Sequence, residues 1–180
     1  MGHISEEELL IIAQEIKLLV LDVDGVLTDG SIILDGAENE LKSFHVRDGH
    51  GIKMLMRSGI SVALITGRRS KVVERRAKEL GISDVFQKCH DKATAYRQLA
   101  EKYSLRDSEI AYVGDDIVDL PVLMACGFPV TVADADDEVK SFARMITKKP
   151  GGRGAVREVC NLLLRAKGLL KGIIDGYSEA

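Results

Sequence analysis

The sequence predicts an α/β fold in which helices flank a mainly parallel sheet. Short apolar runs alternate along the chain with longer stretches whose apolar residues recur at helical spacing. Strands and helices in alternation imply parallel pairing through right-handed crossovers. The first apolar run, 18–21, contains only leucine and valine, so we expect a strand buried on both faces. The length of 180 residues suits one domain, and we expect a single domain over residues 1–180.

The other elements are expected in a regular order after this strand, with one insertion. A β-hairpin is expected at about 30–46, because 31–34 and 41–46 flank a turn rich in Asp, Gly and Asn. Residues 169–180 form a tail without clear periodicity. Further strands are expected at 60–65, 84–87, 110–113 and 129–133, and further helices at 70–80, 92–103, 118–125 and 155–166.

Composition and charge argue against nucleic acid and membrane partners. The formal net charge is -3, which gives no broad attraction to nucleic acid or anionic membranes. No apolar run approaches the ~20 residues that cross a bilayer. The stretch 1–15 has consecutive glutamates and no basic region, so we expect an amphipathic helix rather than a signal peptide. Cys89, Cys126 and Cys160 fit no zinc or disulfide pattern, and we expect a cytoplasmic protein.

Two carboxylates directly follow the first predicted strand. Asp22 and Asp24 are spaced i, i+2, and residues at that spacing share one side of a strand. Open α/β sheets bind ligands at the carboxyl ends of their strands, and two neighbouring carboxylates there repel each other. A divalent cation would relieve this repulsion. Helix capping does not require such a pair.

The other predicted strands lead into residues suited to phosphate chemistry. Each group alone has an ordinary explanation, because an aspartate can cap a helix and a lysine is usually solvated. Together, carboxylates can bind Mg²⁺, and a hydroxyl, backbone N–H groups and an ammonium can bind a phosphoryl group. One carboxylate can then attack phosphorus while its neighbour transfers protons. These residues are Thr66, Gly67 and Arg68 after the strand at 60–65, Lys92 at the start of the helix at 92–103, and Asp115, Asp116 and Asp119 after the strand at 110–113.

In order and spacing, these residues resemble the four motifs of the haloacid dehalogenase (HAD) superfamily of phosphohydrolases. The motifs extend from Asp22 to Asp119. The resemblance implies a Rossmann-like fold and a Mg²⁺-dependent phosphatase. It makes Asp22 the nucleophile and a metal ligand. It makes Asp24 the general acid and base, which also offers its backbone carbonyl to the metal.

The same resemblance implies roles for the remaining motif residues. Thr66 and Lys92 hold the phosphoryl oxygens and balance charge in the transition state. Asp115 is the direct metal ligand of the fourth motif. Either Asp116 or Asp119 supports the metal from an outer position. Between the first two motifs there is room only for the hairpin and one helix, so the chain is similar to the members that lack a cap domain.

Several local segments narrow the resemblance to the phosphatases of 3-deoxy-D-manno-octulosonate 8-phosphate (KDO 8-phosphate). They are 44–53, 65–68, 132–135 and 151–158, and the resemblance covers roughly 16–168. It implies a small phosphorylated sugar acid as substrate, hydrolysis to KDO and phosphate, and a place in lipopolysaccharide synthesis. It also implies a homotetramer in which the hairpins assemble the subunits and neighbours complete each active site.

A sugar acid phosphate has two anionic ends, so arginines are expected beside the metal site. The resemblance implies substrate contacts at Arg68 and Arg76, and also at Arg47. The alternative is that the basic residues of 68–78 form a solvated helix face. The glycine-rich segment 148–154 either binds an anion or closes over a partner's site.

Three alternative functions share the same motif residues or part of them. A phosphatase of a sialic-acid-type 9-phosphate would differ only in its pocket. A phospho-aspartate receiver domain uses similar residues, but its lysine comes last, whereas here Asp115 and Asp116 follow Lys92. An inactive homologue that serves as a binding subunit is argued against by the presence of Asp22, Asp24 and Lys92.

Overall fold

The computed structural model describes residues 5–37 and 39–179. Its centre is a six-stranded parallel sheet in the order β5-β4-β1-β6-β7-β8. Numbered among themselves along the chain, these strands run 3-2-1-4-5-6, the doubly wound order that binds ligands where the order reverses. That point lies between β1 and β6. The strands are β1 (Leu18–Leu21), β4 (Ser61–Ile65), β5 (Asp84–Phe86), β6 (Ile110–Gly114), β7 (Phe128–Thr131) and β8 (Met145–Ile146).

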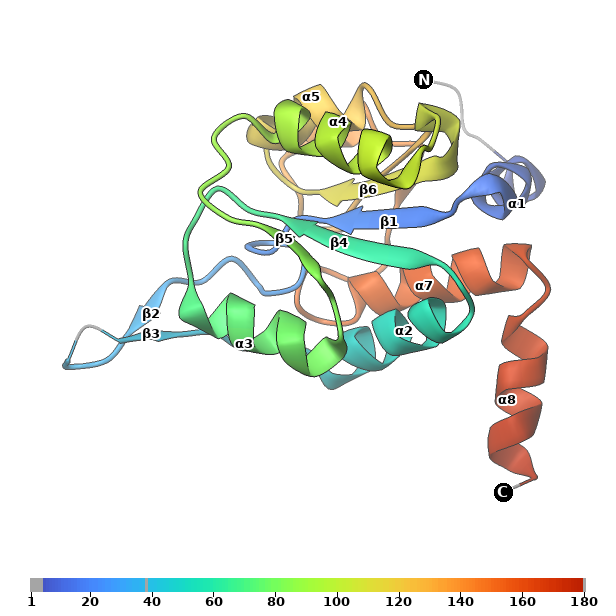
Figure 1. The fold of residues 1–180 in the computed structure, drawn as a ribbon, viewed down its shortest axis with the longest axis horizontal. Coiled ribbons are helices and arrows are strands. Elements are labelled where there is room, and N and C mark those ends of the chain that lie inside the picture. Colours follow the sequence, from blue (N-terminus) through green and yellow to red (C-terminus); the bar gives the residue numbers. More distant parts are fainter. Residues whose placement is uncertain (1–4, 38, 180) are drawn as a thin grey trace.

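Helices cover both faces of this sheet (Figure 1). The expected α/β class with a parallel, Rossmann-like sheet is therefore confirmed. Within residues 5–37 and 39–179, none of the helices is both long enough and apolar enough to cross a membrane. One face carries α1 (Glu6–Glu15), α2 (Val46–Arg57), α3 (Lys71–Leu80) and α7 (Ala155–Ala166), and the other carries α4 (Lys92–Tyr103), α5 (Leu120–Leu123) and α6 (Asp137–Lys140).

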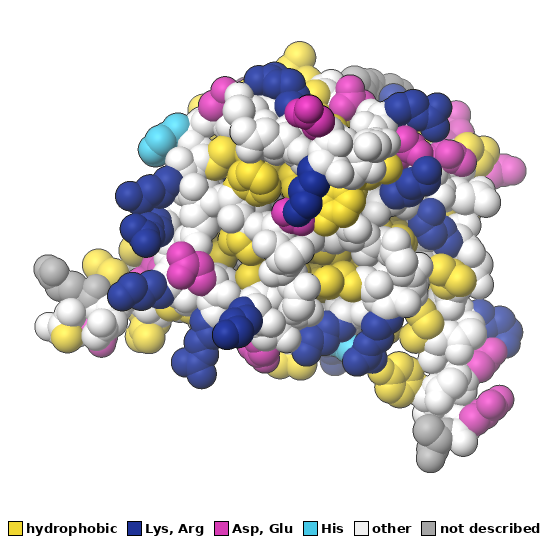
Figure 2. Space-filling model, in the orientation of Figure 1, with side chains coloured by type: hydrophobic (Ala, Val, Ile, Leu, Met, Phe, Trp, Pro, Cys, Tyr) yellow, Lys and Arg dark blue, Asp and Glu magenta, His cyan; other side chains and the backbone are white. Residues whose placement is uncertain are grey.

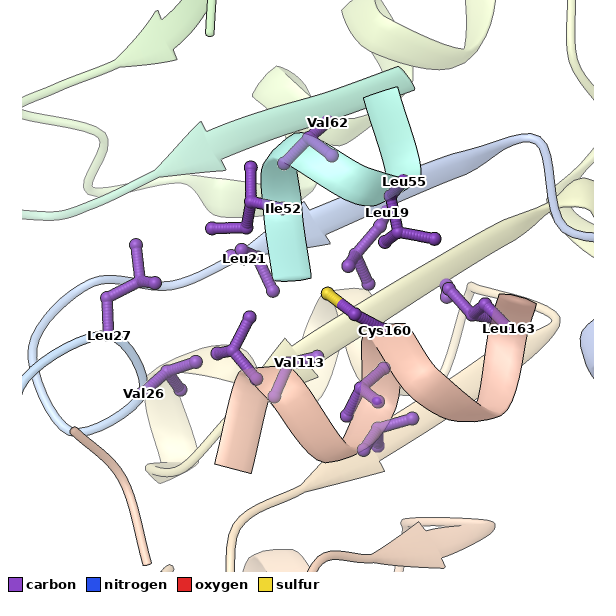
Figure 3. Close-up of a cluster of buried hydrophobic side chains, with 14 of the residues drawn as sticks. Leu19, Leu21, Val26, Leu27, Ile52, Leu55, Val62, Val113, Cys160 and Leu163 are labelled. Carbon is purple, nitrogen blue, oxygen red and sulfur yellow. The ribbon is translucent and has the colours of Figure 1, made fainter. Parts of the chain in front are cut away.

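The larger part of the core lies between β1 and the helices α2 and α7 (Figure 3). Every residue of β1 is buried, as expected of a central parallel strand. Val26 and Leu27, in the turn that follows β1, point into the same cluster (Figure 3) and are buried. This packing anchors the turn that carries Asp24 to the hydrophobic core.

The expected hairpin forms, but it is shorter than predicted. β2 (Ile33–Leu34) pairs in antiparallel fashion with β3 (Glu40–Leu41), and the pair projects away from the sheet (Figure 1). The prediction that the second arm continues to residue 46 is wrong, because α2 begins at Val46. Asp48 in the first turn of α2 favours a helix start, and Ile52 and Leu55 give that helix a buried side.

Other differences from the expected elements lie near the C-terminus and after β6. The predicted helix at 118–125 is a 3₁₀ turn (Ile117–Asp119) followed by the short α5, with Pro121 in its first turn. The tail 169–180, where no periodicity was found, contains the helix α8 (Leu170–Ser178). Ile173 of α8 packs against the core while the glycines interrupt its apolar pattern, which hides the helical period. β8 and α6 were not expected, because both are very short.

Candidate active site

The carboxyl ends of β1 and β6 bring three aspartates together. Asp22 directly follows β1 and Asp115 directly follows β6, and these strands are neighbours. Each of Asp22, Asp115 and Asp119 offers one carboxylate oxygen, and these oxygens lie within 4.8 Å of one another. The cluster therefore occupies the point where the strand order reverses, which is the ligand position of this class of sheet.

Asp22 is a buried carboxylate beside a buried lysine. Its side chain Oδ1 lies 2.9 Å from the Nζ of Lys92, and its backbone N–H donates to the carbonyl of Val113 at 3.0 Å. Burial raises the pKa of Asp22, the charge of Asp119 adds to the rise, and Lys92 opposes it. The result is a fixed oxygen that is poorly hydrated and faces a cation.

Lys92 is placed by the start of α4, where Asp91 caps the helix. Burial works against its ammonium, but the charges of Asp22 and Asp119 outweigh burial and raise the pKa of Lys92. The lysine therefore stays charged between the two acids. An ammonium held in this way can bind the oxygens of a phosphoryl group next to Asp22.

Asp119 uses its carboxylate to hold other groups in place. Its Oδ1 accepts hydrogen bonds from Lys92 Nζ at 2.7 Å and from the Tyr112 hydroxyl at 2.5 Å. Its Oδ2 accepts from the backbone N–H of Asp115 at 3.0 Å. Asp116 is exposed, and its side chain accepts from the N–H of Ile117 at 2.7 Å. Asp119 thus contacts Lys92 and the backbone of Asp115, and an outer supporting role toward a metal stays a prediction for Asp119 and Asp116.

Asp115 has the features expected of a metal ligand. Its Oδ1 is buried and has no hydrogen-bond partner within the described part of the chain. Burial, followed by the charges of Asp22 and Asp119, raises the pKa of Asp115 to about 8. A Cβ at Gly25 would lie 2.0 Å from Asp115 Oδ2, so only glycine leaves room for this carboxylate. A hard cation bound to Asp22 and Asp115 would satisfy the orphaned oxygen and neutralise the cluster.

The backbone turns away from the strand direction before Asp24. β1 ends at Leu21, and residues 24–27 form a turn with Gly25 at φ 93°. The argument that Asp22 and Asp24 share one side of a strand is therefore wrong. The Asp24 carboxylate instead forms an ion pair with Lys42, next to the hairpin. This does not test the backbone carbonyl of Asp24 as a metal ligand, which stays a prediction.

The loop after β4 places Thr66, Gly67 and Arg68 at the same edge of the sheet. Thr66 is buried, and its Oγ1 accepts a hydrogen bond from the N–H of Arg68 at 3.3 Å. The Arg68 guanidinium lies 3.3 Å from Glu40 of the hairpin. Arg68 is therefore close to the predicted phosphate loop, although its partner within this chain is an acid.

The other two predicted arginines have different surroundings. Arg76 on α3 pairs with Glu79 at 2.9 Å and lies 5.7 Å from the ring centre of Phe44. Arg76 lines a small hollow together with Asp48, and the apolar side chains of Phe44 and Leu80 line the same hollow. Arg47 is exposed in the first turn of α2. A substrate role for both stays a prediction. Figure 2 shows other basic side chains gathered around α3.

The glycine-rich segment packs against the turn after β1. A Cβ at Gly151 would lie 1.7 Å from the carbonyl oxygen of Gly25, and the N–H of Gly152 donates to Val26 at 2.9 Å. Asp48 anchors the end of the segment, because its carboxylate accepts from the N–H of Gly154 at 3.2 Å. These contacts give the segment a packing role, which neither of the two sequence-based interpretations included.

Sequence reasoning also missed Lys42 and Asp48. Lys42 follows a short hairpin strand and looks like an ordinary surface lysine. Asp48 lies at a helix start, where an acid is common. Both become informative only when burial is known, because their side chains are 1% and 2% exposed.

Comparison with known proteins identifies the family to which this chain belongs. The model for the haloacid dehalogenase-like hydrolases matches residues 81–158. The 3-deoxy-D-manno-octulosonate 8-phosphate phosphatase of Yersinia pestis is 48% identical over 160 residues, 89% of this chain and 86% of its own length. The chain belongs to the family of the KDO 8-phosphate phosphatases. The resemblance expected from the motifs is thus confirmed, and the protein is a phosphatase.

Solved structures of the family share the whole architecture. The crystal structure of the Yersinia pestis phosphatase is 46% identical, has a TM-score of 0.90, and covers 91% of this chain and 89% of its own. A structure from Moraxella catarrhalis, described as a complex with magnesium ion, phosphate ion and KDO, is 44% identical with a TM-score of 0.93, and covers 95% and 98%. The strand order also excludes the receiver alternative, whose sheet has the order 2-1-3-4-5.

Proposed function

We propose that this protein hydrolyses KDO 8-phosphate to KDO and phosphate in a Mg²⁺-dependent reaction. The observation that carries the proposal is the joint position of Asp22, Asp115 and Lys92 at the β1–β6 edge. The names of the relatives support this substrate, and so does the Moraxella catarrhalis complex with magnesium, phosphate and KDO.

Asp22 is the nucleophile in this proposal. Its carboxylate oxygen attacks phosphorus, the bond from phosphorus to the sugar oxygen breaks, and an aspartyl-phosphate forms. Asp24 gives its proton to the departing sugar oxygen. Asp24 then takes a proton from water, which attacks the aspartyl-phosphate, releases phosphate and restores Asp22. The contact between Asp22 and Lys92 supports this assignment, because the lysine balances the phosphoryl charge next to the attacking oxygen.

The remaining residues of the site bind rather than react. Lys92 and Thr66 hold the phosphoryl oxygens, and Asp119 keeps Lys92 in position. Asp22, Asp115 and the backbone carbonyl of Asp24 would hold Mg²⁺, which would neutralise negative charge between the carboxylates and the phosphate. Arg68 is the candidate for the carboxylate end of the sugar acid, and Arg76 and Arg47 are candidates across a subunit boundary.

We further propose a homotetramer that acts in the cytoplasm on a step of lipopolysaccharide synthesis. The exposed apolar side chains of the hairpin support the assembly, with Leu34 60% and Leu41 52% exposed. The carboxylate cluster lies at the same sheet edge from which the hairpin projects (Figure 1). A neighbouring subunit could therefore complete the site without a cap domain.

Phosphate release with three substrates tests the proposed function. We compare KDO 8-phosphate, a sialic-acid-type 9-phosphate and p-nitrophenyl phosphate, each with Mg²⁺ and then with EDTA. The expected result is a kcat/KM for KDO 8-phosphate several orders of magnitude above the others, loss of turnover in EDTA, and recovery with Mg²⁺. Preference for the 9-phosphate would reassign the substrate, and indifference to EDTA would contradict the metal site.

A further inference from the structure

Lys42 is a buried cation at the base of an otherwise exposed hairpin. Its side chain is only 1% exposed, whereas Ile33 and Leu34 on the same hairpin are 44% and 60% exposed. The ammonium pairs with the Asp24 carboxylate and lies 3.3 Å from Glu40 Oε1. This side chain thus reaches from the base of the hairpin to the turn after β1.

Glu40 connects the same lysine to the loop after β4. Its carboxylate accepts hydrogen bonds from the Ser70 hydroxyl and from the Arg68 guanidinium. Ser70 caps α3, because its Oγ accepts from the N–H of Val73 at 3.3 Å. Lys42 and Glu40 therefore join the turn that carries Asp24 to the loop that carries Thr66.

A buried ion pair of this kind is weak evidence for a role in stability. Removing a lysine from water is costly, and attraction to its partners offsets that cost only in part. An apolar side chain at this position would serve packing as well. The placement is explained better by a requirement for Asp24, whose half-buried side chain is 21% exposed and could otherwise rotate toward solvent.

We propose that Lys42 is a positioning residue that holds the Asp24 side chain toward the leaving group, because its ammonium can donate to an Asp24 oxygen whether the carboxyl group is protonated or ionised. The proposal rests on the proposed function, in which Asp24 transfers the proton to the departing sugar oxygen. Glu40 gives Lys42 a second acidic partner, so the lysine stays in place throughout the reaction cycle. The hairpin then contributes to chemistry in its own subunit, besides any part in assembly.

The effect of losing Lys42 should depend on the leaving group. A sugar alkoxide or phenolate is strongly basic and needs a proton as it departs, whereas p-nitrophenolate departs without one. A misplaced general acid therefore slows the release of a sugar alkoxide or phenolate more than the release of p-nitrophenolate. A general loss of structure would slow all substrates to the same extent.

The test compares Lys42→Met and Lys42→Arg with the wild type on KDO 8-phosphate, phenyl phosphate and p-nitrophenyl phosphate. General acids contribute about 10²- to 10⁴-fold, so we expect Lys42→Met to lower kcat on the basic leaving groups at least about tenfold more than on p-nitrophenyl phosphate. KM should change little, and Lys42→Arg should recover most of the loss. Lys102→Met, which removes a lysine paired with Asp84 away from the site, is the matched control and should leave these ratios unchanged.

The variant Asp24→Asn separates the proposal that Asp24 is the general acid from the proposal that Lys42 positions it. If Asp24→Asn shows the leaving-group dependence and Lys42→Met slows every substrate equally, the inference about Lys42 is overturned while the role of Asp24 stands. If Asp24→Asn itself shows no such dependence, the proposed acid is wrong. Circular dichroism and Tm are measured for each variant, and Lys42→Gln replaces Lys42→Met if the latter does not fold.

Discussion

At the scale of single residues, the site depends on acids that the fold keeps away from water. Asp22 and Asp115 are brought to one edge of the sheet, and burial raises the pKa of both. Asp119 has its oxygens taken up by Lys92, Tyr112 and backbone N–H groups. Asp22 and Asp115 are therefore available to a cation or a phosphoryl group, while Asp119 fixes Lys92 beside Asp22.

Asp22→Asn should abolish turnover and leave the fold intact. The amide cannot attack phosphorus, so we expect kcat to fall below about one thousandth of the wild-type value. The amide has nearly the same size and removes a poorly hydrated charge, so Tm should change little. Phosphate release and thermal unfolding measure the two effects, and retained turnover would refute the nucleophile assignment.

Asp115 should make the metal-free protein less stable as pH rises. The pKa of Asp115 is raised to about 8 in the fold by burial and then by the charges of Asp22 and Asp119, whereas an ordinary aspartate has a pKa of 3.8. Between these values the unfolded chain has lost a proton that the fold retains, so raising the pH favours unfolding. In EDTA, Tm should fall between about pH 4 and pH 8, and Asp115→Asn should reduce this fall.

Calorimetry with Mg²⁺ provides the control for this prediction. Binding requires the ionised carboxylate, so Mg²⁺ should raise Tm more at the upper end of this pH range than at the lower end. A wild-type protein and an Asp115→Asn variant with the same pH dependence in EDTA would show that the pKa of Asp115 is not raised.

At the scale of elements, two irregular segments support the site. The turn after β1 is anchored to the hydrophobic core by its own buried side chains, Val26 and Leu27 (Figure 3). The glycine-rich segment before α7 packs against the same turn, because Gly151 closely approaches the carbonyl of Gly25. Regular strands bring the motif residues to one edge, and these two segments set the direction of Asp24 and the space for Asp115.

Gly151→Ala should therefore damage both stability and activity. Its Cβ would overlap the Gly25 carbonyl oxygen, 1.7 Å away, so the turn after β1 must move. Severe point mutations cost about 3 kcal/mol or more, which corresponds to a fall in Tm of roughly 6–12 °C for a chain of this size. Gly36→Ala, where a Cβ meets nothing within 4 Å, is the matched control and should resemble the wild type. A Gly151→Ala variant with normal kcat would contradict the supporting role.

At the scale of the whole molecule, the motif residues gather at the carboxyl edge of one sheet, and the hairpin extends beyond that edge (Figure 1). Ile33, Leu34 and Leu41 expose apolar surface that a monomer would leave in water. Covering this surface with a second copy is the physical basis of the proposed tetramer.

Light scattering should give a mass near four times 19.7 kDa. Replacing Ile33 and Leu34 with aspartate should lower this mass, because charges on the apolar face oppose its burial. If subunits complete one another's sites, kcat/KM should fall together with the mass. A monomeric wild-type protein with full activity would defeat the proposal of shared sites, and unchanged mass in the variant would exclude the hairpin as the interface.

The sequence by itself determined the α/β class, the strands of the central sheet apart from β8, and the motif residues Asp22, Thr66, Lys92 and Asp115. Periodicity and strand ends are local properties, and parallel pairing places those ends at one edge. The tertiary structure decided that Asp24 turns away from Asp22 toward Lys42, that Asp119 rather than Asp116 contacts Lys92, and that Gly151 supports Gly25. These outcomes depend on burial and on contacts between segments far apart in the chain, which no local pattern contains.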